Sequence, residues 1–192
     1  TKASIPEFPV VFFKSLNTVQ NPGDPILLPT HLRSDQVDYE CELAVVIGKP
    51  CLNVTRDNAV DYVLGYTIGN DMSSRSIEGE NPLYLPQAKC YDKSAAIGPC
   101  IFVTDKPLPT DTAISVEIYR GVKVFEGRTE INQIKRKFHE LVAYLYKETT
   151  FPHGCLLMTG TGIVPPNEFT LQKNDEIRIT IDAIGTLINT VE

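Results

Sequence analysis

A continuous apolar run over residues 43–47 follows directly after two glutamates, Glu40 and Glu42. Such a run is typical of a buried β-strand, and strand side chains alternate between two faces, so both carboxylates point the same way. Two neighbouring anions at the mouth of a packed strand are costly unless a cation compensates them, and their oxygens suit a hard divalent metal. The alternative is a solvated pair of glutamates at a strand end. The apolar run favours the metal site, of which this stretch supplies half.

A second acidic element lies downstream, where a short β-type run over residues 65–69 ends in Asn70 and Asp71. An aspartate at a strand end, close to a turn, is well placed to supply a third oxygen ligand. We therefore expect Asp71 to join Glu40 and Glu42.

Alternating or continuous apolar patterns predict most of the other elements. Further strands are expected at residues 10–13, 97–103, 114–118 and 177–181, with a hairpin turn at 120–121. Apolar residues at helical spacing predict one long helix over 132–147. A short helix is expected to start at Thr55 and to end near Val63, and residues 76–86 are expected to form a loop. Because helices do not alternate regularly with strands, the expected fold class is α+β, mostly β, in one domain over residues 1–192.

Charge and cysteine content exclude several classes of partner. The net charge of -6 argues against nucleic acid, and no apolar stretch is long enough to cross a membrane. The five cysteines form no C-x-x-C pair, which argues against a disulfide framework or a zinc site. The cytoplasm is the expected compartment, with the mitochondrial matrix as the alternative.

A set of short motifs, in order along nearly the whole chain, resembles the fumarylacetoacetate hydrolase family. The motifs are Val10-Val11-Phe12-Phe13-Lys14, Tyr39-Glu40-Cys41-Glu42-Leu43, Asn70-Asp71-Met72-Ser73-Ser74-Arg75, Ala88-Lys89-Cys90-Tyr91-Asp92, Ile97-Gly98-Pro99, Asn174-Asp175-Glu176 and Gly185-Thr186-Leu187. The resemblance implies a mixed β-sandwich roll with one long helix and short helices.

The resemblance also implies roles for individual residues. Glu40, Glu42 and Asp71 match the family's ligands of one Mg²⁺ or Mn²⁺, and Lys89 matches its active-site lysine, which holds a substrate carboxylate or stabilises an oxyanion. Arg75 and Thr161 are expected to bind substrate; a structural ion pair and a plain turn residue are the respective alternatives.

The activity implied is that of a metal-dependent enzyme acting on a β-keto or 1,3-diketo acid through a metal-stabilised enolate. Hydrolysis of a C–C bond in an acylpyruvate-like substrate ranks first, followed by oxaloacetate-type decarboxylation or keto-enol tautomerisation. A non-catalytic binding protein that retains the fold is the alternative of another class. The resemblance further implies a homodimer.

Two features depart from the family pattern. Many members carry a His-x-x-Glu pair on an N-terminal lid upstream of the segment that contains Lys14. We expect that such a lid precedes this sequence; the alternative is a catalyst that lacks the pair. Glu78 replaces a glutamine, so an anionic group of the substrate is disfavoured beside it unless Glu78 faces solvent or pairs with Arg75. No catalytic role is assigned to His31, the histidine nearest the acidic strand.

Overall fold

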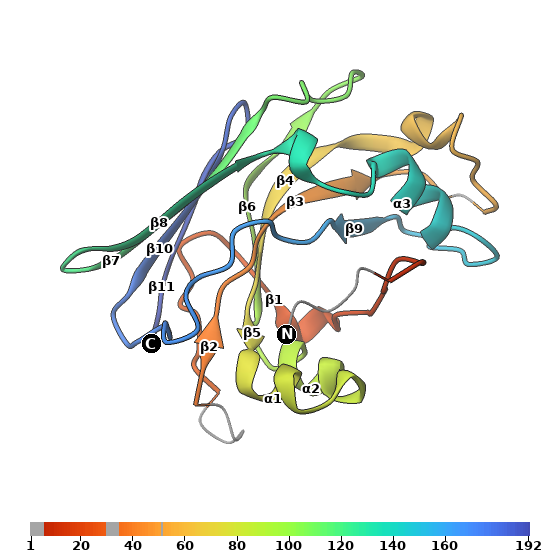
Figure 1. Ribbon diagram of the computed structural model, residues 1–192. Helices are drawn as coiled ribbons and strands as arrows, with labels where there is room; N and C mark the ends of the chain where they lie inside the picture. Colours follow the sequence, from red (N-terminus) through yellow and green to blue (C-terminus); the bar gives the residue numbers. More distant parts are fainter. Residues whose placement is uncertain (1–5, 30–34, 51) are drawn as a thin grey trace.

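Two β-sheets contain most of the strands in the computed structural model, which describes residues 6–29, 35–50 and 52–192 (Figure 1). His31 lies outside the described residues. The first sheet has the order β1-β6-β4-β3-β9, and its strands are β1 (Val19–Gln20), β6 (Ala95–Val103), β4 (Val63–Asp71), β3 (Cys41–Ile47) and β9 (Cys155–Met158). The second has the order β11-β10-β7-β8, with β11 (Gly185–Thr190), β10 (Glu176–Ile181), β7 (Ala113–Arg120) and β8 (Val122–Glu130).

Short elements surround these sheets. Strand β2 (Val37–Asp38), which precedes β3 in the chain, pairs with β5 (Ser73–Ser74), which follows β4. The helices are η1 (Leu16–Thr18), η2 (Ala59–Tyr62), α1 (Arg75–Glu80), η3 (Pro82–Tyr84), α2 (Leu85–Lys89), η4 (Ile131–Gln133) and α3 (Phe138–Leu145). The expected α+β, mostly β class is confirmed.

One hydrophobic core joins the two sheets. It includes Leu43 and Val45 of β3, Ile68 of β4, Ile118 of β7 and Ile179 of β10, all buried. Every residue of β3 is buried, so both faces of this strand are covered, and β4 and β9 flank it within the sheet. The continuous apolar run that predicted this strand therefore reflects a position in the interior of a sheet.

The antiparallel pairing of β3 and β4 positions the acidic residues. Cys41 lies opposite Asn70 and Glu42 lies opposite Gly69, and the Asp71 amide donates to the Glu40 carbonyl at 3.0 Å. A Cβ on Gly69 would lie only 2.6 Å from the Met158 Cε on the same face of the sheet. Glycine at this position thus leaves room for the end of the Met158 side chain, which reaches across β3 from β9.

Several expected elements differ from those in the structure. The predicted strand at 10–13 is wrong: these residues form no strand, and the Val10 and Phe13 side chains are both 67% exposed. The predicted long helix over 132–147 is also wrong, since α3 begins only at Phe138. Ile134 and Lys137 are extended, and the Arg136 guanidinium donates to the carbonyls of Pro6 and Glu7.

Two shorter predictions also need correction. The helix expected over 55–63 is reduced to η2. The loop expected over 76–86 is instead largely helical, because Pro82 and Pro86 occupy first-turn positions of η3 and α2, where a missing backbone N–H costs nothing.

Candidate metal centre

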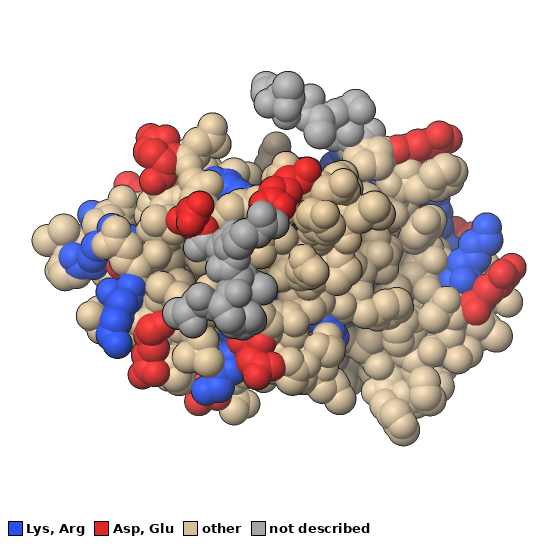
Figure 2. Space-filling model, turned by 90° about the horizontal axis from the view of Figure 1, so that it is seen from below, with Lys and Arg blue, Asp and Glu red and all other residues tan. Residues whose placement is uncertain are grey.

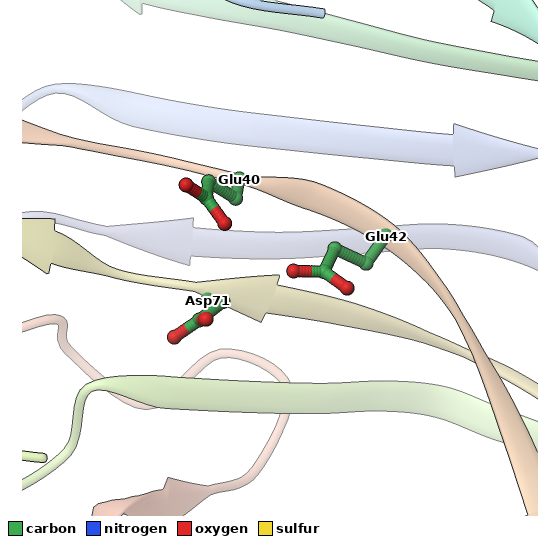
Figure 3. Close-up of side chains that lie close together, drawn as sticks. All are labelled: Glu40, Glu42 and Asp71. Atoms are coloured by element: carbon green, nitrogen blue, oxygen red, sulfur yellow. The ribbon is translucent and has the colours of Figure 1, made fainter. Parts of the chain in front are cut away.

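The three predicted carboxylates meet at one point of the first sheet. Glu42 lies on β3 and Glu40 directly precedes this strand, whereas Asp71 ends β4; the three side chains point toward a common region (Figure 3). One carboxylate oxygen from each residue lies within 4.8 Å of the others. Glu42 and Asp71 are only 3% and 2% exposed, respectively. The structure thus brings together all three residues that the sequence predicted as ligands.

Burial makes the negative charge of this cluster expensive. It is the main cause that raises the pKa of Glu42 to about 8, and the neighbouring charges of Glu40 and Asp71 add to the shift. The pKa of Glu40 is also raised, chiefly by burial, although Lys89 opposes the effect. A cluster of this kind is stabilised by a compensating cation.

Lys89 supplies part of that compensation. Its ammonium lies 2.7 Å from Glu40 Oε2 and 3.3 Å from Asp71 Oδ2, and it donates to the Ser73 hydroxyl at 2.7 Å. Burial alone would lower the pKa of Lys89, but Glu40 and Asp71 raise it above its usual value. The side chain therefore carries a fixed positive charge beside the carboxylates, as expected for the residue that the sequence matched to an active-site lysine.

Lys14 is a second cation at this centre and was not among the predicted site residues. Its ammonium lies 2.6 Å from Asp71 Oδ1 and also donates to the Lys89 carbonyl. In the same segment, the Phe12 ring centroid lies 5.8 Å from the Lys89 ammonium. Residues 10–14, predicted as a strand, thus cover one side of the acidic cluster. In the sequence, Lys14 directly follows an apolar run and ends one of the motifs that resemble the family, but neither feature identified its partner.

The loop after β9 closes another side. The Gly160 amide donates to Glu42 Oε2, and Gly160 has a φ of 86°, a conformation that favours glycine. The Thr161 hydroxyl lies 3.5 Å from the Cys41 sulfur and accepts from the Ile163 amide at 3.2 Å. Thr161 therefore has the hydrogen bond of a turn residue, and it also lines a cavity beside the acidic cluster.

A cavity of about 220 Å³ opens beside the cluster. Its lining residues are Asp38, Tyr39, Glu40, Ser73, Arg75, Glu78, Thr161, Ile163, Val164 and Pro165. Arg75 lies 3.1 Å from Asp38 Oδ2, so the structural ion pair considered from the sequence is present, in a position that also faces the cavity. Glu78 lines the cavity as well.

The donor set suits a divalent cation that prefers oxygen. Three carboxylates from two adjacent strands converge, two are almost fully buried, and two ammonium groups only partly balance their charge. Hard cations such as Mg²⁺ and Mn²⁺ take carboxylate ligands and keep positions for water or substrate. The residues present therefore fit such an ion.

Comparisons with known proteins agree with this chemistry. Residues 1–192 match the family model described as fumarylacetoacetate (FAA) hydrolase C-terminal. A probable 2-keto-3-deoxyxylonate dehydratase of Haloferax volcanii is 41% identical over 95% of this chain and 60% of its own length. Oxaloacetate tautomerase YisK of Bacillus subtilis is 34% identical over 100% of this chain and 64% of its own length. The chain thus spans less than two thirds of each of these relatives.

A solved structure with a bound ion is also similar. It is 2-keto-3-deoxy-D-arabinonate dehydratase complexed with magnesium and 2,5-dioxopentanoate, which matches with a TM-score of 0.80 at 37% identity. The match covers 92% of this chain and 59% of that protein. Together with the acidic cluster, this neighbour supports divalent-metal binding.

Proposed function

This chain belongs to the fumarylacetoacetate hydrolase family, and we propose that it contributes the active site of a divalent-metal-dependent enzyme that converts a 2-keto acid through an enolate. The observation that carries the proposal is the convergence of Glu40, Glu42 and Asp71 beside a cavity, with Lys89 in contact. A purely structural cluster gains nothing from placing buried carboxylates at an open cavity.

Glu40, Glu42 and Asp71 are the proposed ligands of one Mg²⁺ or Mn²⁺. When bound, such an ion polarises a keto oxygen and stabilises the negative charge of an enolate. The Gly160 amide, which donates to Glu42, orients that carboxylate in the centre.

The two lysines and Ser73 have separate proposed tasks. Lys89 remains protonated, so it holds the substrate carboxylate or a developing oxyanion and does not act as a base. Its hydrogen bond to Ser73 and its ion pair with Glu40 fix the direction of the ammonium. Lys14 holds Asp71 in place from the opposite carboxylate oxygen.

Among enolate reactions, dehydration of a 3-deoxy-2-keto acid ranks first. The dehydratase relative and the magnesium-bound dehydratase neighbour support this order. A base takes the proton of carbon 3, whose electron pair passes into the enolate; the enolate then forms the double bond between carbons 3 and 4 as the C–O bond of carbon 4 breaks, and the departing hydroxyl takes up one proton and leaves as water. Tautomerisation ranks second, supported by the oxaloacetate tautomerase. The acylpyruvate hydrolysis that the sequence ranked first, and decarboxylation, share the enolate but have less support.

We also propose a homodimer. Several apolar side chains are exposed: Val10, Phe13 and Leu16 near the N-terminus, and Leu83 in η3. Figure 2 views the molecule from the side of α1 and α2, and a broad area of this face carries few charged side chains. Sedimentation analysis of the purified protein tests the proposal, and a monomer at all concentrations contradicts it.

No helix among the described residues is long and apolar enough to cross a membrane. The cytoplasm remains our proposed compartment.

Turnover assays with and without metal test the proposed function. The purified protein is offered 3-deoxy-2-keto pentonates, oxaloacetate and acylpyruvates with Mg²⁺, with Mn²⁺ and with EDTA. We expect turnover of at least one keto acid that EDTA abolishes and that Glu42→Gln removes. Turnover that persists in EDTA contradicts the metal mechanism. Metal-dependent keto acid binding without turnover of any substrate supports the non-catalytic binding protein instead.

A further inference from the structure

We infer that the part of the cavity beside α1 binds a hydroxyl group on the substrate chain and disfavours a second carboxylate. This inference rests on the proposed function, since it concerns the portion of a 2-keto acid that extends away from the metal centre. The residues concerned, called the tail subsite below, are Asp38, Tyr39, Arg75 and Glu78, and all four line the cavity.

The four residues lie close together in the fold. Asp38 belongs to β2, and its carboxylate lies 3.1 Å from the Arg75 guanidinium at the start of α1. Glu78 follows Arg75 by three residues in α1, so the two side chains lie on neighbouring positions of one helix face. Tyr39 follows Asp38 directly, and its ring packs against Phe125 at a centroid distance of 5.7 Å.

Two buried donors of the tail subsite lack a partner. The Tyr39 side chain is fully buried, and within the described parts of the chain its hydroxyl makes no hydrogen bond. Arg75 uses one terminal nitrogen on Asp38, whereas its buried Nη1 has no partner among the described residues. Buried donors are rarely left unpaired in folded proteins, so these two atoms indicate a ligand with acceptor atoms.

The charges decide which acceptor fits. Asp38 already neutralises Arg75, so Glu78 leaves the tail subsite with a net negative charge. A second carboxylate would accept from Tyr39 and Arg75 but would be repelled by Asp38 and Glu78. A hydroxyl group can accept a hydrogen bond from one donor while it donates to a carboxylate, and an apolar chain would leave the donors unpaired. Hydroxylated 2-keto acids therefore match the tail subsite best.

Binding measurements with four unreactive or slowly reacting ligands test this inference with Mg²⁺ present. Pyruvate measures how tightly the protein binds the 2-keto acid group that all four ligands share. Three five-carbon acids differ only in the far end: 2-oxopentanoate is apolar, 5-hydroxy-2-oxopentanoate carries a hydroxyl, and 2-oxoglutarate carries a carboxylate. The hydroxy acid has no leaving group on carbon 4, so it cannot be dehydrated. Titration calorimetry then gives a dissociation constant for each ligand.

We expect the hydroxy acid to bind about tenfold more tightly than either of the other five-carbon acids. In Glu78→Gln, the affinity for 2-oxoglutarate should rise about tenfold, with little change for pyruvate. In Tyr39→Phe, the advantage of the hydroxy acid over 2-oxopentanoate should shrink several-fold. Glu80→Gln serves as the matched control, because this substitution removes the same charge from the same helix. Glu80 is exposed and does not line the cavity.

The outcomes separate this inference from the proposed function. Equal binding of the three five-carbon acids by the unmodified protein, with pyruvate still bound in a metal-dependent way, overturns the tail subsite alone. The same holds if Glu78→Gln and Glu80→Gln change 2-oxoglutarate binding equally. If pyruvate does not bind when Mg²⁺ is present, the proposed function fails and the tail subsite fails with it.

Discussion

The affinity of the acidic cluster for a divalent cation should rise with pH up to about 8 and then level off. A cation binds the ionised form of Glu42, whereas burial, together with the charges of Glu40 and Asp71, raises the pKa of this carboxyl to about 8. Below that pH, each cation that binds displaces one proton. The dissociation constant for Mg²⁺ or Mn²⁺ should therefore increase about tenfold for each pH unit of acidification.

The stability of the metal-free protein should change with pH in the opposite direction. The carboxyl of Glu42 has an ordinary pKa of 4.5 when unfolded and about 8 when folded, so between these values the folded state binds the extra proton. The free energy of unfolding then falls as pH rises through this window, by at most about 1.4 kcal/mol per pH unit from this group. Saturating metal removes this slope, because Glu42 is then ionised in the folded state as well.

Two measurements check these expectations. Calorimetric titration of Mn²⁺ in buffers of different ionisation enthalpy counts the protons released, and urea unfolding with EDTA or with Mg²⁺ gives the stability at each pH. Glu42→Gln should lose both metal affinity and proton release, whereas Glu168→Gln, at an exposed position, should lose neither. A dissociation constant that does not vary between pH 6 and pH 8 (roughly two orders of magnitude are expected) would refute the reasoning.

Three further predictions concern single residues. Lys89→Met should retain metal binding but lower kcat/KM by about 100-fold or more, as measured by steady-state kinetics, because the charge beside Glu40 is lost; an unchanged value contradicts the role of the ammonium. Gly65→Ala should lower the melting temperature measured by calorimetry, because the new methyl overlaps the Phe102 carbonyl; the expected loss is about 3 kcal/mol. Arg120→Met leaves the fully buried Asp175 without its paired guanidinium, so urea unfolding should show a loss of about 3 kcal/mol, and a loss below about 1 kcal/mol argues against a strong ion pair.

The strands were predictable where burial alternates or is continuous along the chain. In β7 and β10, isoleucine and valine face the core while polar neighbours are less buried, and the resulting period of two marks both strands. In β3, complete burial gives the unbroken apolar run. The hairpin of β7 and β8 was predictable because Gly121 permits the positive φ of 74° that the turn uses.

The local pattern of apolar residues gave wrong secondary structure where these residues do not pack into a strand or helix interior. Residues 10–13 have the composition of a strand, but Val10 and Phe13 are exposed and Phe12 lies beside the Lys89 ammonium. The helical spacing of apolar residues extends upstream of α3, yet Arg136 contacts the N-terminal segment and the chain there is extended. Both cases depend on contacts between segments more than a hundred residues apart or on exposed surface, which a local window does not contain.

The site was predictable in its ligands but not in its surroundings. Glu40, Glu42 and Asp71 stand out because acidic residues adjoin strands, a pattern visible in sequence. Lys14 contacts Asp71 only because the N-terminal segment packs beside the end of β4, and Tyr39 has the sequence appearance of an ordinary core aromatic residue. Contacts of this kind come from tertiary packing, so single residues in the sequence carry little signal for them.

The way in which β3 and β4 are paired gives a bound ion a second effect, on folding. A shift of one residue in this pairing would turn the carboxylates of Glu40 and Glu42 to the opposite face of the sheet, away from Asp71. An alignment shifted by one residue does not present three oxygens to one cation, so the ion stabilises the native alignment relative to it. Metal present during refolding should therefore raise the yield of correctly paired chains, beyond any effect on the folded protein.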